Sequence, residues 1–112
     1  MIAHINGKLV EKTPTFVVID VNGIGYHIKI SLQTFSSIKD DFCKLYTHLS
    51  IKEDAHTLFG FFEKSERELF IKLISVSGVG PSTAQIILST FNSHEVIHYI
   101  TSADVNAIKS VK

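Results

Sequence analysis

The turn Gly78-Val79-Gly80-Pro81 carries the clearest chemical signal in this sequence. Glycine adopts backbone conformations that other residues avoid and has no side chain, so neighbouring peptide amides can approach a phosphate closely. A helix that starts at Pro81 would also point the positive end of its dipole at that phosphate. The turn therefore predicts a contact with a nucleic-acid backbone, and such a contact does not depend on base sequence.

The residues around this turn favour that interpretation over a plain tight connection between helices. An apolar helical pattern precedes the turn, Ala84 follows it at a packing position, and Lys72 is the only charged residue between Leu69 and Ser93. No carboxylate in that stretch would repel phosphate. Together these features form a helix-hairpin-helix pattern, in which we expect Val79 to hold the turn against the core. The expected DNA-binding residues are Val76, Ser77, Gly78, Val79, Gly80, Ser82 and Thr83.

Other candidate groups give weaker signals. His94 and His98 are spaced to share one helical face, but no third ligand accompanies them, so we predict a solvated face, no metal site and no cofactor. The aromatic residues of the segment 59–62 could stack on bases, although core or subunit contacts are more usual for such density. Glu53 and Asp54 are adjacent carboxylates in a predicted turn. By themselves they suggest a solvated loop, and a catalytic dyad is disfavoured because neighbours on an extended chain point apart.

Composition limits the classes of function. The chain has 112 residues, 11 basic and 11 acidic, so it does not grip DNA by bulk positive charge. It contains neither the ~20-residue apolar run of a membrane helix nor a secretion signal, which predicts a cytoplasmic protein. Cys43 is the only cysteine and is expected to be a buried thiol.

The first sixty residues read as short strands. Asn22-Gly23 predicts a type I′ hairpin turn between two of them. Five short strands in a segment of this length favour a small closed barrel of the OB type. The expected strands are Ile2–Glu11, Thr15–Val21, Ile24–Ile30, Phe42–Ile51 and Thr57–Phe62.

The remainder reads as helical. Ser65 with Glu68 has capping-box spacing, Ser93 is expected to cap the helix after the one at Pro81, and Ser102 is expected to cap a further helix through Val105 and Ile108. The predicted fold is α+β, with an OB-like barrel domain at 1–62 and a helix-hairpin-helix domain at 63–112. A weak echo of Ser75-Val76-Ser77 at residues 110–112 suggests that this domain stops before a second hairpin.

The chain resembles the RuvA family of Holliday junction branch-migration proteins along nearly its whole length. Several separate motifs occur in the family's order, which makes the resemblance specific. They are Met1-Ile2 with Gly7, the segment 18–26, Tyr46-Thr47-His48-Leu49, Lys52-Glu53-Asp54-Ala55, Leu58-Phe59-Gly60-Phe61, Glu66-Arg67-Glu68-Leu69-Phe70 and Gly78-Val79-Gly80-Pro81.

The resemblance implies a non-catalytic homotetramer that holds four-way junction DNA. Its implied partners are a hexameric branch-migration ATPase, bound through a further domain, and the junction-resolving nuclease. Glu53 and Asp54 match the family's acidic pin, whose charge would repel phosphate where strands cross. This sequence departs from the family at His4, Asn6 and Ser82, where basic residues are usual, and this puts the affinity for DNA in doubt.

Two other functions stay open from the residues alone. The chain could be a generic structure-specific DNA-binding module without preference for junctions. It could also be a fragment of a DNA glycosylase-like enzyme, in which a catalytic Asp follows the hairpin, and Asp104 stands downstream of Gly80. A base pocket needs more chain than this, and Asp104 suits the start of a helix.

Overall fold

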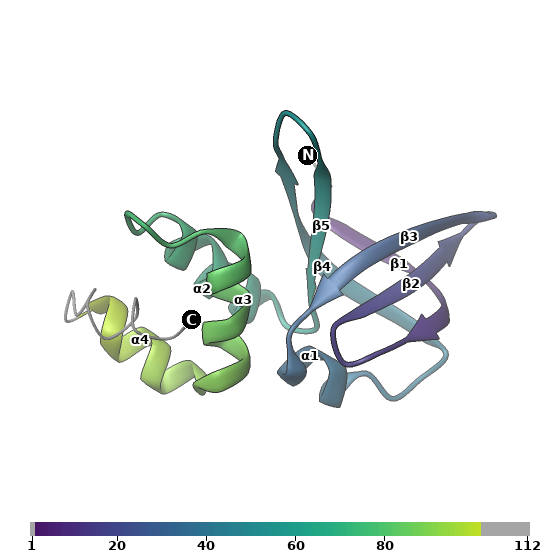
Figure 1. Cartoon of the computed structure of the whole chain (residues 1–112). Coiled ribbons are helices and arrows are strands. Elements are labelled where there is room, and N and C mark those ends of the chain that lie inside the picture. The colour runs from purple at the N-terminus through teal and green to yellow at the C-terminus, as the bar shows by residue number, and fades with distance from the viewer. Residues whose placement is uncertain (1, 102–112) are drawn as a thin grey trace. The chain divides into compact units, whose positions relative to one another are not determined.

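A computed structural model describes residues 2–101, without the side chains of Ser93, Tyr99 and Thr101 (Figure 1). The chain divides into two compact units, Met1–Arg67 and Glu68–Lys112. Helix α2 crosses this division and begins just after residues 62 and 63, where the sequence predicts a domain boundary. The elements are β1 (His4–Lys12), β2 (Phe16–Val21), β3 (Ile24–Ile30), α1 (Leu32–Ser37), β4 (Phe42–Ile51), β5 (His56–Phe61), α2 (Lys64–Ile74), α3 (Pro81–Thr90) and α4 (Ser93–Thr101).

The first unit is a closed barrel with the strand order β1-β2-β3-β5-β4. Its pairs are antiparallel except for β3 with β5, which run parallel after the crossover through α1. Alternating residues such as Val17 and Ile19 on β2 point inward and are fully buried. The predicted five-stranded barrel is confirmed.

The hairpin between β2 and β3 turns at Asn22 and Gly23. Both residues have positive φ, 54° and 89°, as a type I′ turn requires. The Asp20 carboxylate accepts a 2.9 Å hydrogen bond from the Gly23 amide and fixes the turn further. The predicted turn is confirmed.

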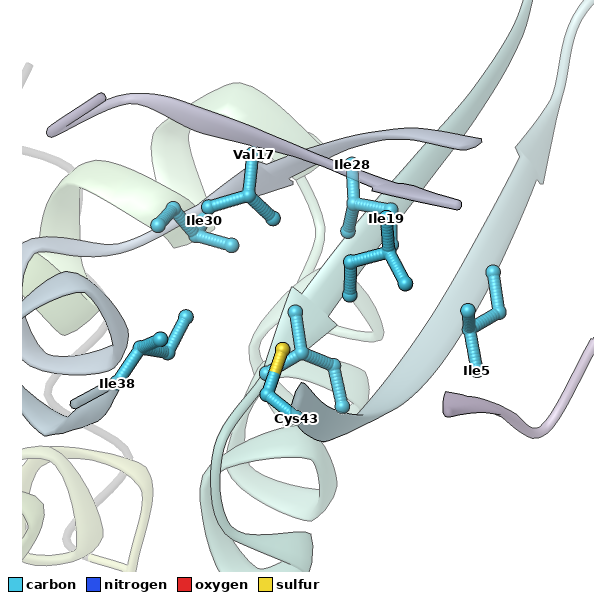
Figure 2. Packing of buried hydrophobic residues seen from close by; sticks show 8 residues of the cluster. Ile5, Val17, Ile19, Ile28, Ile30, Ile38 and Cys43 are labelled. Atoms are coloured by element: carbon cyan, nitrogen blue, oxygen red, sulfur yellow. The ribbon is translucent and has the colours of Figure 1, made fainter. Parts of the chain in front are cut away.

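The barrel core is built from aliphatic side chains together with one thiol (Figure 2). Cys43 is 8% exposed and points in among the isoleucines, so the predicted buried thiol is confirmed. Burial raises the pKa of this thiol, while the charge of Lys12 acts to lower the pKa. The buried cluster consists of Ile5, Val17, Ile19, Ile28, Ile30, Ile38, Cys43 and Leu45.

Helix α1 lies between the third and fourth strands, in a segment for which the sequence predicts neither helix nor strand. The Ser31 side chain caps this helix by accepting a hydrogen bond from the Thr34 amide. The hydroxyl groups of Ser31 and Thr34 also donate 2.8 Å hydrogen bonds to the buried carboxylate of Glu66, at the start of α2. The first turn of α2 is thereby fixed to the barrel unit.

Within residues 68–101 the second unit contains the part of α2 after Arg67 together with α3 and α4. Their buried faces include Leu73 on α2, Ala84, Ile87 and Leu88 on α3, and Val96 on α4. These faces have the apolar spacing seen in the sequence, which confirms helices here. None of the helices described between residues 2 and 101 is long and apolar enough to cross a membrane.

Two predicted helix caps are wrong. Helix α2 begins at Lys64, and the Arg67 amide bonds to the Glu63 carbonyl, so Ser65 lies inside the first turn. Helix α4 is capped by Asn92, because its side chain accepts a hydrogen bond from the Glu95 amide and the Glu95 carboxylate accepts one from the Asn92 amide. The asparagine forms the capping box one residue before the predicted serine.

The expected fourth helix falls outside the described residues. Ser102, Asp104, Val105 and Ile108 lie there, as does the repeat-like segment 110–112.

Candidate nucleic-acid interface

The glycine turn connects α2 to α3 through a tight reversal of the chain at residues 76–79. The Val79 amide donates a 3.0 Å hydrogen bond to the Val76 carbonyl, which closes a four-residue turn. Gly78 stands at the third position of this turn with φ of 84°, the conformation for which a type II turn selects glycine. The turn needs Gly78 for its backbone.

Two of the predicted contact residues instead hold the turn in place. The Val79 side chain is 5% exposed and its amide is used inside the turn. The Val76 amide donates to the Leu73 carbonyl at 3.0 Å and continues the end of α2. Val79 therefore packs into the core as predicted, and neither amide is available to a ligand.

The amides of Ser77, Gly78 and Gly80 are available. All three residues are exposed, and within residues 2–101 these amides have no hydrogen-bond acceptor. Gly80 has extended backbone angles, φ −90° and ψ 174°, which any residue can adopt, and a Cβ added there would meet nothing within 4 Å. Neither the backbone angles nor the packing at position 80 therefore requires glycine. Because Gly80 has no side chain, nothing at this position covers the amides at the start of α3.

Helix α3 presents its N-terminus beside these amides. Pro81 occupies the first turn, and the first intrahelical bond runs from the Ala84 amide to the Gly80 carbonyl at 2.9 Å. The amides of Ser82 and Thr83 precede that bond and are unpaired, as in the first turn of any helix. No side chain caps this terminus and its first turn has no acidic residue, so the positive dipole end is not neutralised locally.

Glu53 and Asp54 form the tip of a two-stranded ribbon in the first unit. The Lys52 amide donates to the Ala55 carbonyl at 2.8 Å, which leaves the two acids as the central residues of the turn. Both are exposed. They occupy a turn and not an extended strand. The argument that neighbouring side chains on an extended chain point apart, which disfavoured a catalytic dyad, therefore does not apply to them.

This ribbon extends beyond the closed part of the barrel (Figure 1). Strand β1 pairs with β4 only as far as Tyr46, and β3 pairs with β5 only at Leu58–Gly60. Among residues 2–101 the Thr47 amide still donates to the Ala3 carbonyl, whereas residues 48–51 of β4 and 56–57 of β5 pair only between these two strands, as far as Ile51 and His56. The two carboxylates are therefore displayed at the end of a narrow projection of the barrel unit.

The remaining candidates are placed as follows. Phe59 and Phe61 are buried, which excludes them from stacking on bases and confirms their core role, whereas Phe62 is 40% exposed. His4 and Asn6 are exposed on β1. Among residues 2–101 no group of three or more His, Cys, Asp or Glu side chains is arranged to hold a metal ion.

The contacts that the first turn of α2 makes within the barrel unit were not predicted. Arg67 donates a 3.0 Å hydrogen bond to the Ala3 carbonyl and lies 5.6 Å from the Tyr46 ring centre. A Ser-x-x-Thr spacing directly after the third strand, typical of a short capped helix, was the available signal for Ser31 and Thr34.

Comparison with protein families gives two matches. Residues 1–60 match the RuvA N terminal domain. Residues 70–112 match the SAM-like helix-hairpin-helix tandem, which includes the glycine turn.

Curated relatives match over the full chain. A protein of Christiangramia forsetii is 60% identical, one of Flavobacterium psychrophilum 58% and one of Cytophaga hutchinsonii 57%. Each is named Holliday junction branch migration complex subunit RuvA. The alignments cover 100% of this chain but only 57–58% of each relative.

Proposed function

Because the chain belongs to the RuvA family, we propose that it binds four-way junction DNA without catalysis, in support of ATPase-driven branch migration in recombination and repair. The relatives are named as subunits of a branch migration complex. The chain spans a little more than half of their length, so this proposal concerns the DNA-holding part of the activity. It needs no cofactor, and its setting is the cytoplasm.

The observation that carries the proposal is the set of unpaired amides at the glycine turn. The amides of Ser77, Gly78 and Gly80 are exposed beside the uncapped start of α3. Together with the amides of Ser82 and Thr83, they suit the oxygens of one phosphate group. Such a contact reads the backbone and not the bases, so recognition depends on the shape of the DNA.

The acidic ribbon tip supplies discrimination in this proposal. Glu53 and Asp54 would lie where strands cross and repel phosphate, which disfavours an uninterrupted duplex at that point. In the part of the chain that the structure describes, the outer end of the ribbon that displays them consists of β4 and β5 alone. The two acids would act as a pin that repels phosphate. The glycine turn would bind phosphate, and we call this contact the junction grip.

The proposed assembly follows the family. Four copies would repeat the grip around a junction as a homotetramer, so that one phosphate contact per subunit becomes several. The proposed protein partners are a hexameric branch-migration ATPase and the junction-resolving nuclease. Several such contacts in one tetramer would compensate for the missing positive charge at Ser82, because linked binding sites raise the overall affinity without any additional contact in each subunit.

A charge placed at Gly80 tests the grip. The Gly80→Glu variant should bind a labelled four-way junction at least ten times more weakly than Gly80→Gln, because only the former adds a negative charge beside the phosphate site. The backbone angles and open space at Gly80 accept either side chain, so both variants should keep the melting temperature of the original protein. Binding would be measured by fluorescence anisotropy.

Competition with linear duplex of equal length separates junction recognition from general DNA binding. A junction preference in the original protein supports the proposal. Equal affinity for both DNAs would favour the generic binding module, and equal junction affinity of the two Gly80 variants would remove the turn from the interface. Cleavage of damaged-base DNA would favour the glycosylase alternative.

A further inference from the structure

The outward face of the β1–β4 pair combines exposed aromatic and basic side chains. Lys8 on β1 lies directly opposite Phe42 on β4, and Lys44 follows two residues along the same strand. Cys43 between them points into the core (Figure 2), which places its two neighbours on the outside. Phe42 is 69% exposed, although a phenylalanine ring is normally buried in a strand.

A pocket of about 480 Å³ adjoins this face within the first unit. Phe42 and Phe62, both partly exposed, line it together with the Tyr46 ring. The Lys44 ammonium lies 5.1 Å from the centre of that ring. The pocket therefore presents flat aromatic surfaces beside a positive charge. Its full lining is Ser37, Lys39, Asp40, Phe42, Cys43, Lys44, Tyr46 and Phe62.

Basic side chains adjoin the aromatic side chains of this face. Lys39 and Lys44 line the pocket beside its aromatic side chains, and Asp40 is the only carboxylate among the lining residues. Lys8 lies opposite Phe42 on β4 and opposite Asp20 on β2. Within residues 2–101 neither Lys8 nor Lys44 forms an ion pair with a carboxylate. The register of β1 against β4 makes the two lysines diagonal neighbours. Two like charges held so close favour an anionic partner.

We propose that this face, which we term the Phe42 patch, binds single-stranded nucleic acid, with a base stacked on Phe42 and phosphates beside Lys8 and Lys44. Bases in a duplex are already stacked on each other, so an exposed ring is of use only to an unpaired strand. Interleaved aromatic and basic residues are the usual means of binding single strands without sequence preference. The site goes beyond the proposed junction grip, which lies in the other unit.

A second copy of the chain is the other occupant that exposed rings could suit. Lys8 and Lys44 argue against the packing of two copies of this face on each other, since two positive charges on one copy would meet two on the other. An anionic strand satisfies the rings and the lysines together. The test therefore measures association of the protein as well as binding.

The experiment compares two labelled oligonucleotides of about 12 nucleotides, oligo(dT) and an abasic strand of equal length. The abasic strand keeps the phosphates but cannot stack. The protein should bind oligo(dT) about tenfold more tightly, and Phe42→Ala should remove this difference. Phe42→Leu should behave like Phe42→Ala, because leucine is apolar but not flat.

The lysines are tested through salt dependence. The double variant Lys8→Gln, Lys44→Gln should flatten the slope of log affinity against log salt by about 1.4 for both oligonucleotides. Lys29→Gln is the matched control, since Lys29 is exposed on β3, which pairs with neither β1 nor β4. It should leave the slope unchanged. Asp40→Asn should strengthen binding, an effect that a purely structural role would not give.

Three results would overturn the proposal. The first is equal binding of the two oligonucleotides by the original protein. The second is a Phe42→Ala variant that still prefers oligo(dT) over the abasic strand. The third is a Phe42→Ala variant whose molecular mass in solution, measured by light scattering, changes while its oligo(dT) binding does not. The last would assign the patch to a second copy. Affinity for a fully paired junction is measured in parallel, so that failure of the junction proposal is recognised separately.

Discussion

The Ser31 hydroxyl donates a 2.8 Å hydrogen bond to Glu66 Oε2, and this bond joins residues 35 positions apart. Thr34 donates a second 2.8 Å bond to the other carboxylate oxygen, Oε1. Glu66 is 6% exposed, so these hydroxyls replace the water that a carboxylate would otherwise bind. A cap of one short helix thus also fixes the start of the helix that leads toward the glycine turn.

Removal of either hydroxyl should destabilise the protein. Ser31→Ala and Thr34→Val should each lower the free energy of unfolding by about 1–3 kcal/mol, because each leaves a buried carboxylate oxygen without its donor. Urea denaturation followed by circular dichroism would measure the loss. Ser36→Ala is the control, since Ser36 is exposed on the same helix and should change stability by less than about 0.5 kcal/mol. Equal effects at positions 31 and 36 would contradict the anchoring role.

Glu66 should also make stability depend on pH. Burial raises the pKa of this carboxyl above its ordinary value of 4.5, the hydroxyls of Thr34 and Ser31 oppose that rise, and the charge of Glu63 adds to it. The folded-state pKa is higher than the unfolded-state pKa, so the contribution of Glu66 to stability is full below the unfolded-state pKa and is lost as pH rises through the folded-state pKa.

A Glu66→Gln variant isolates this titration, because the amide does not ionise. The stability of the original protein minus that of Glu66→Gln should fall as the pH is raised from below the unfolded-state pKa of this carboxyl toward neutral. Urea denaturation across this range would measure it, and titrations of all other groups cancel in the difference. A difference that stays constant or grows with pH would show that the carboxyl is not destabilised by burial.

The barrel was predictable because its signals are local. Alternating apolar residues mark each strand, and Asn22-Gly23 specifies its own turn. Helix α1 was not predicted although Ser31 and Thr34 have the spacing of a local cap, and the bonds of their hydroxyls to Glu66, far along the chain, could not be read from sequence. The cap of α4 was misplaced by one residue because serine and asparagine cap helices about equally well, although the spacing of Asn92 and Glu95 was a capping-box signal that their hydrogen bonds bear out.

The glycine turn was located from sequence, but the roles of its residues were not. The pattern could not reveal that the amides of Val76 and Val79 are used within the turn, since that depends on its closure. Nor could it separate Gly78, which needs positive φ, from Gly80, which does not. The Phe42 patch required the register of β1 against β4, which joins segments distant in sequence.

The two glycines should respond differently to alanine. Gly78→Ala should lower the free energy of unfolding by about 1–3 kcal/mol, because a residue with a side chain is strained at φ of 84°. Gly80→Ala should be close to neutral, since its backbone is extended and the added methyl group meets no atom. Thermal or urea denaturation would measure both. A larger loss at position 80 than at position 78 would contradict the assigned turn.

Neutralising the ribbon tip should weaken discrimination and leave the fold unchanged. The double variant Glu53→Gln, Asp54→Asn retains shape and removes both charges, and the two side chains are exposed, so stability should change by less than about 0.5 kcal/mol. Its affinity for linear duplex should rise relative to that for a four-way junction, by about tenfold at low salt and less at high salt, where repulsion is screened. Competition anisotropy with both DNAs would measure the ratio. Glu63→Gln, which removes an exposed carboxylate outside the ribbon, is the control and should leave the ratio unchanged. If both variants shift the ratio equally, the effect is one of overall charge and the tip is not a pin.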